Sequence, residues 1–223
     1  EPFAPDVEGE LDAGVTLATL AREMKWLPAI ENRGEGVFML FKNQAIHDWL
    51  GRDAVKARGG QLTEGFGCWK EDHRGSKREF PGLPYIMLHS LSHLLITAVS
   101  LECGYPASSI RERIYAGNAG YGILLYTATS DAEGTLGGLV ETGKRIAMHL
   151  KTALESGRLC SNDPVCAQHN PANTHERRFL HGAACHGCLL IAETSCEQHN
   201  DFLDRALVAR TAENLGAEFF PMK

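Results

Sequence analysis

The longest stretch of apolar residues runs from position 83 to position 101 and is apolar on nearly every side of the helix that it would form. A helix of that kind has to be buried, and Gly104 supplies the glycine that commonly follows a helix end. We therefore predict a central buried helix here. Its two histidines, His89 and His93, lie four residues apart and share one face.

Shorter patterns predict the elements around this helix. Apolar runs at 35–41 and 120–129 are typical of buried strands. Helical spacing of apolar residues predicts helices over 44–52 and about 139–155, and a short amphipathic helix near the N-terminus. Capping-box spacing predicts further helices from Ser109 to Tyr115 and from Thr194 to Val208. The mixture indicates an α/β fold of the α+β kind, with buried central helices packed on a small sheet.

Two glycine-rich segments interrupt these patterns. Residues 53–78 are polar, basic and rich in glycine, so we predict a flexible loop there. Its basic residues and aromatics are open to two interpretations, a solvated linker with anchoring aromatics or a surface that grips phosphates and stacks bases. Residues 130–138 follow a predicted strand and precede a predicted helix, as phosphate-binding turns do. They lack the lysine of a Walker motif, so we expect tight packing of the turn rather than ATP binding.

Composition narrows the class of protein. Of the 223 residues, 43% are hydrophobic and 22% are charged, which is ordinary for a soluble globular chain. With a net charge of −6, the surface as a whole does not attract nucleic acid. By the sequence, no unbroken apolar run reaches the roughly eighteen residues that a membrane helix requires, and the first residues do not resemble a signal region. We therefore expect a cytoplasmic protein with no membrane partner.

The cysteines carry the clearest candidate chemistry. Five of the seven lie in the last third of the chain, and four form two spaced pairs. Two pairs of thiols are how a chain builds a tetrahedral metal site, and zinc accepts four thiolates while leaving no position for a substrate. The predicted zinc ligands are Cys160, Cys166, Cys185 and Cys188.

Other roles for these residues stay open at this point. Cys185 and Cys188 also have the spacing of a dithiol redox pair, and isolated cysteines are commonly small buried apolar residues. Cys196 or His186 would be able to replace one of the four ligands.

A catalytic alternative uses a different set of residues. His89 and His93, joined by Asp131 and Glu133, would form an open metal site of a nuclease or phosphohydrolase. The glutamate that zinc hydrolases carry between two such histidines is missing. Core histidines bonded to backbone are the competing interpretation.

Several longer motifs resemble one family. They are residues 89–95, 111–115, 122–126 and 133–139, the two thiol pairs, and residues 193–197 with 203–207. From about Gly34 to Phe220 the chain resembles the zinc-binding domain at the C-terminus of Mrf-type DNA-repair helicases and in DrmB. DrmB is a component of the DISARM anti-phage defence system that works beside the helicase DrmA.

The resemblance implies that the four paired cysteines bind zinc. It further implies a non-catalytic accessory module, without a helicase motor, that associates with a DrmA-like helicase and engages DNA through the complex. The acidic charge favours docking on a partner at least as strongly as direct contact with DNA. We expect an N-terminal segment 1–82 and a zinc-binding domain 83–223, or one continuous domain over 34–220.

Overall fold

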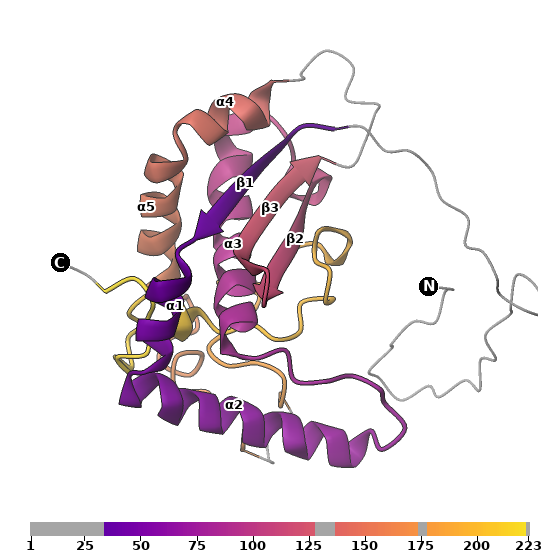
Figure 1. Cartoon of the computed structure of the whole chain (residues 1–223), viewed down its shortest axis with the longest axis vertical. Helices are drawn as coiled ribbons and strands as arrows, with labels where there is room; N and C mark the ends of the chain where they lie inside the picture. Colours follow the sequence, from indigo (N-terminus) through magenta and orange to yellow (C-terminus); the bar gives the residue numbers. More distant parts are fainter. Residues whose placement is uncertain (1–33, 128–136, 174–177, 222–223) are drawn as a thin grey trace, which may run out of the picture. The chain divides into compact units, whose positions relative to one another are not determined.

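The computed structural model describes residues 34–127, 137–173 and 178–221. The helix predicted near the N-terminus and most of the turn at 130–138 lie outside these residues. Within them, helices and an antiparallel sheet form a mixed α/β fold, as predicted (Figure 1).

The sheet has three strands in the order β1-β3-β2, namely β1 (Gly36–Phe41), β2 (Ile110–Gly117) and β3 (Gly120–Thr127), among the described residues. The central strand β3 pairs with both neighbours, so Leu125 lies opposite Val37 on one side and Glu112 on the other. The strand predicted at 120–129 is confirmed over Gly120–Thr127, the part of it that the structure describes. The strand predicted at 35–41 is confirmed too, but it is an edge strand whose Leu40 is 76% exposed, not a buried one.

Helix α3 (Leu83–Cys103) is the predicted central helix and packs against β2 and β3 on one side of the sheet (Figure 1). It ends at Gly104, which has a left-handed φ of 78°. Its length and apolarity would suffice to cross a membrane, contrary to the expectation from the sequence, and 78% of the relevant window is buried inside the structure. Packing against the protein therefore accounts for its apolar surface.

Helices α4 (Gly138–Lys144) and α5 (Ile146–Gly157) replace the single helix predicted at about 139–155, and both contact α3. Helix α1 (Asn43–Leu50) is confirmed. The Trp49 indole donates a 2.8 Å hydrogen bond to the Ala217 carbonyl, which joins α1 to the C-terminal segment.

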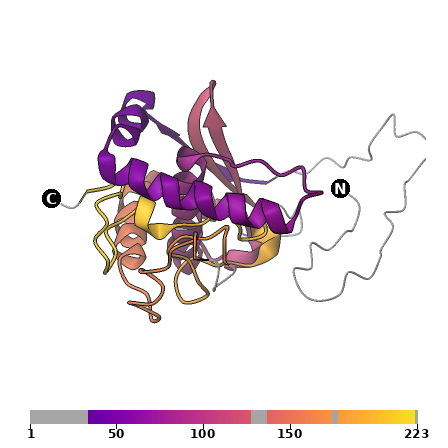
Figure 2. The ribbon, with the colours of Figure 1, turned by 90° about the horizontal axis from the view of Figure 1, so that it is seen from below.

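Helix α2 (Asp53–Asp72) occupies the segment predicted to be a flexible loop, so that prediction was wrong. Figure 2 shows it as one continuous helix. Val55, Leu62 and Trp69 recur at helical spacing and are buried, which gives the helix an apolar face. The glycines on this face permit close packing, since a Cβ at Gly65 would lie 2.7 Å from the Phe179 carbonyl oxygen.

Two of the basic residues of this segment form ion pairs within the fold. Arg58 is buried and its Nε lies 2.6 Å from Asp204 Oδ2. Arg78 pairs with Asp201 at 2.6 Å. Trp69 is buried in the apolar core, and the half-buried Phe66 packs against that core.

Two predicted helices are absent. Residues 110–117 form β2, because Ile110, Glu112 and Ile114 alternate with exposed residues and face inward. The segment from Thr194 to Val208 is irregular apart from two short 3₁₀ turns at Glu193–Ser195 and Arg205–Leu207. Positive φ angles at His199, Asn200 and Phe202 are incompatible with a continuous right-handed helix.

Side chains from α1 and α2 share one apolar core with α3 and the sheet. Residues on both sides of position 82 thus contribute to the same core.

Candidate metal centre

The first thiol pair lies in a loop that follows α5. The Asp163 carboxylate organises this loop by accepting hydrogen bonds from the backbone of Cys160 at 3.0 Å and of Ala167 at 3.2 Å. It also accepts from the guanidinium of Arg205, a buried residue. The loop geometry is therefore set by a carboxylate between the two cysteines and a cation from the C-terminal segment.

The second thiol pair lies in a tight turn. The Cys185 carbonyl accepts from the backbone N–H groups of Cys188 and Leu189, both at 3.0 Å. Gly187 lets the first loop approach this turn, since a Cβ there would lie 2.6 Å from Ser161 Oγ.

The four sulfur atoms of these two segments converge and all lie within 4.8 Å of one another. The Sγ–Sγ distances are 3.3 Å from Cys160 to Cys185, 3.7 Å from Cys166 to Cys188 and 3.8 Å from Cys185 to Cys188. Tetrahedral zinc with its usual bonds to sulfur would place the ligands about 3.8 Å apart. None of the cysteines is in a disulfide. The donor set and its spacing therefore fit a zinc ion.

Neighbouring groups stabilise negative charge on these sulfurs. The Asn162 backbone donates to Cys160 Sγ at 3.4 Å, and its side-chain amide donates to Cys185 Sγ at 3.3 Å. The hydrogen bond with Cys188 and the nearby Arg205 cation lower the pKa of the Cys166 thiol to about 5 even though burial opposes this. The same hydrogen bond and burial raise the pKa of the Cys188 thiol, and burial raises that of Cys160. Cys166 is therefore the thiol whose metal-binding thiolate form the surroundings favour most.

The two substitute ligands considered from the sequence lie elsewhere. His186 is exposed and is not part of the four-sulfur group. Cys196 is buried beside His89, with Sγ 3.1 Å from the imidazole Nε2.

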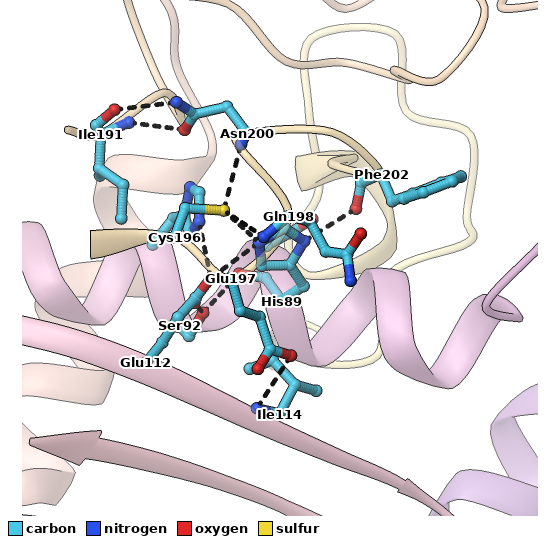
Figure 3. Close-up of polar contacts among 12 residues, drawn as sticks. His89, Ser92, Glu112, Ile114, Ile191, Cys196, Glu197, Gln198, Asn200 and Phe202 are labelled. Atoms are coloured by element: carbon cyan, nitrogen blue, oxygen red, sulfur yellow. Dashed lines mark hydrogen bonds and ion pairs between the residues drawn. The ribbon is translucent and has the colours of Figure 1, made fainter. Parts of the chain in front are cut away.

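His89 and His93 belong to a second cluster, with Glu112 and Cys196 (Figure 3). Burial alone would lower the pKa of His89, but the charge of Glu112 and the hydrogen bond with Cys196 raise it to about 10. Asp131 and Glu133, their predicted companions, lie outside the described residues. Sequence reasoning missed Glu112 because the segment was assigned to a helix, although the alternation of Ile110, Glu112 and Ile114 would have placed this carboxylate on the buried face.

The glycine-rich turn, for which tight packing was expected, leads into α4, whose N-terminus is already occupied by a carboxylate of the chain. Glu35 accepts hydrogen bonds from the backbone N–H groups of Gly137, Leu139 and Val140 at 3.0–3.1 Å. Tight packing is thus the role of the described end of this turn.

Residues 91–189 match the family described as MrfA Zn-binding domain. Over this segment the chain is similar to the MrfA Zn-binding domain family. The resemblance inferred from the sequence is confirmed, and all four clustered thiols lie inside the MrfA Zn-binding domain segment.

A relative extends the similarity to either side of this segment. The chain is 41% identical over 198 residues to the DISARM protein DrmB of Bacillus paralicheniformis (strain ATCC 9945a / NCIMB 11709 / CD-2). The alignment covers 87% of this chain and 35% of that protein, so the chain spans about a third of the relative's length.

Proposed function

We propose that residues 34–220 form one continuous zinc-binding module in which Cys160, Cys166, Cys185 and Cys188 hold a zinc ion. The convergence of the four sulfurs carries this proposal. Two features support it: Arg205 offsets the excess negative charge of four thiolates, and the matched family segment contains all four cysteines.

The role of this zinc is structural. Four sulfur ligands complete a tetrahedral shell and leave no position for a reacting water molecule. The described residues between 158 and 192 contain no long helix or strand, so a metal cross-link between the two thiol loops supplies order that the backbone there does not. Zinc binding and folding of this region are therefore coupled.

The module acts, in this proposal, as a non-catalytic accessory part of a DISARM-type anti-phage complex in the cytoplasm. The 41% identity with the DISARM protein DrmB supports this assignment. Its partner is a DrmA-like helicase, and DNA is engaged through the complex. A net charge of −6 and the burial of Arg58 and Trp69 in the fold support docking on that partner over direct DNA binding.

The nuclease or phosphohydrolase alternative has less support from the geometry. His89 and His93 have no exposed surface, and their Nε2 atoms face Glu112 and not an open cavity. A metal that activates water for hydrolysis needs an accessible coordination position.

The test combines metal analysis with partner capture. The Cys188→Ser chain should lose about one zinc ion relative to the unmodified chain and should lose hydrogen-exchange protection at 158–192. Cys68→Ser is the matched control, because this cysteine lies outside both clusters. The co-encoded helicase should copurify with the unmodified and control chains but not with Cys188→Ser.

Two results would contradict the proposal separately. Unchanged zinc content in Cys188→Ser would contradict the proposed four-thiolate site. A zinc-loaded chain that does not copurify with the helicase would contradict the proposed accessory role. Cleavage of labelled DNA by the purified chain with Mg²⁺ or Mn²⁺, abolished by His93→Ala, would favour the enzyme instead.

A further inference from the structure

Four potential metal ligands meet in the core, and none of them is one of the paired thiols. His89 and His93 come from adjacent turns of α3, Glu112 comes from β2, and Cys196 follows the 3₁₀ turn Glu193–Ser195 (Figure 3). One ligand atom from each residue lies within 4.8 Å of the others. All four side chains are buried, and neither histidine has any exposed surface.

The contacts within the cluster are short. His89 Nε2 lies 2.8 Å from Glu112 Oε1 and 3.1 Å from Cys196 Sγ. His93 Nε2 lies 3.2 Å from the same Glu112 oxygen. A tetrahedral zinc ion would separate nitrogen, oxygen and sulfur ligands by about 3.3–3.6 Å, so only small outward movements would be needed to seat one.

Backbone carbonyls set the tautomer of both imidazoles. His89 Nδ1 lies 3.2 Å from the Phe202 carbonyl oxygen, and His93 Nδ1 lies 2.8 Å from that of Leu189. A carbonyl oxygen only accepts, so each Nδ1 carries the proton and donates. In the neutral ring, Nε2 then presents its lone pair to the cluster, as in metal-binding histidines whose second nitrogen bonds to backbone.

The two anionic ligands are held in the same way. Cys196 Sγ accepts from the backbone N–H groups of Gln198 at 3.3 Å and Asn200 at 3.1 Å. The second oxygen of Glu112 accepts from the Ser92 hydroxyl, which leaves Oε1 directed at the histidines. These outer contacts fix the orientation of each ligand.

Charge balance favours a dication at the centre. A carboxylate and a thiolate contribute two negative charges, and two neutral imidazoles contribute none. Acceptor atoms facing one another at 2.8–3.2 Å in a buried site require compensating positive charge. Two additional protons or one divalent cation would supply it, and the mixed nitrogen, oxygen and sulfur donor set is one that zinc binds.

We propose that His89, His93, Glu112 and Cys196 form a second metal site, a closed structural zinc centre in the core. It shares no residue with the four-thiolate site, although the Leu189 carbonyl that His93 contacts directly follows Cys188. It would tie α3, β2 and the C-terminal segment together. Two of its ligands, His89 and Cys196, lie outside the segment that matches the MrfA Zn-binding domain.

The experiment measures zinc content and zinc X-ray absorption on the full chain after removal of loosely bound metal. The unmodified chain should hold about two zinc ions, with nitrogen or oxygen as well as sulfur in the averaged coordination shell. Cys196→Ser and Glu112→Gln should each lose one ion and leave a shell dominated by sulfur. Cys103→Ser, a buried cysteine outside both clusters, should keep both ions.

The outcomes separate the two centres. A first result is one ion with sulfur ligands alone in the unmodified chain, which Cys196→Ser retains and Cys188→Ser loses. That result would contradict the second site and support the first. One ion lost by Cys196→Ser but retained by Cys188→Ser would support the second site and remove the first. If the core variants fail to fold, the count and coordination shell of the unmodified chain still decide.

Discussion

Glu35 shows how a single carboxylate fixes the start of a helix. It accepts hydrogen bonds from three backbone N–H groups at the beginning of α4 and from the Tyr105 hydroxyl at 2.8 Å. Burial by itself would raise the pKa of this carboxyl, but the hydrogen bonds from Val140, Tyr105 and Leu139 lower it below its ordinary value. The ionised form is thus favoured by folding.

We predict that Glu35→Gln lowers the free energy of unfolding by about 1 kcal/mol at pH 7, because a charged helix cap is replaced by a neutral one. A lowered folded-state pKa means that the stabilisation is complete above the unfolded-state pKa of about 4.3 and is lost as pH falls through the folded value. The difference between the two proteins in urea unfolding should therefore shrink in acid. Exposed Glu141→Gln is the control, and a loss that does not change with pH would contradict the assignment.

Residue type alone does not reveal burial at the other charged positions. Arg58 and Glu112 look like surface residues in the sequence, yet each is nearly inaccessible. Arg58 is compensated by Asp204, and Glu112 lies beside two histidines. Buried charges persist only when such partners are present, and those partners come from distant positions.

At the scale of elements, α2 shows that glycines can serve helix packing. Gly59 and Gly65 lie on its buried face, where a Cβ would come within 2.7 Å of Leu83 Cδ1 and of the Phe179 carbonyl oxygen, respectively. Gly60 and Gly67 lie on the exposed face with no atom within 4 Å of the added Cβ position. Packing requires Gly65, because its Cβ would meet rigid backbone, whereas the Cβ at Gly59 would meet the end of a flexible side chain. The exposed pair only weakens the helix.

The exposed pair and Gly65 should respond in opposite directions to alanine. Gly60→Ala and Gly67→Ala should each stabilise the chain by roughly 0.5–1 kcal/mol, since alanine loses less backbone entropy in a helix. Gly65→Ala should destabilise it by about 1–3 kcal/mol, since the new methyl group meets rigid backbone. Thermal and urea unfolding measure all three. Equal small effects at all positions would mean that 53–72 is not a packed helix.

At the scale of the whole molecule, the core depends on segments on both sides of position 82. Strand β1 pairs with β3, and Trp49, Val55 and Leu62 pack into the core that contains α3. A boundary at residue 82 would expose these contacts, which is the physical reason for proposing a continuous domain over 34–220.

A fragment of residues 83–223 should consequently fail to unfold in a cooperative transition, because it lacks an edge strand and a large part of the apolar core. A fragment of residues 34–223 should unfold cooperatively. Urea titrations followed by circular dichroism, with zinc present throughout, compare the two. Equal cooperativity of both fragments would instead support a domain boundary at residue 82.

The amino-acid sequence alone predicted those elements that the pattern of adjacent residues is enough to define. Continuous apolarity identified α3 and β3, helical spacing identified α1, and the spacing of two thiol pairs anticipated the meeting of four sulfurs. Only tertiary structure decided that a glycine-rich basic segment is α2, that 110–117 is a strand, and that Cys196 lies against His89 although 107 positions separate them. The reason is physical: periodicity is a property of neighbouring residues, whereas burial, close approach of glycine and ligand pairing depend on surfaces supplied by remote parts of the chain.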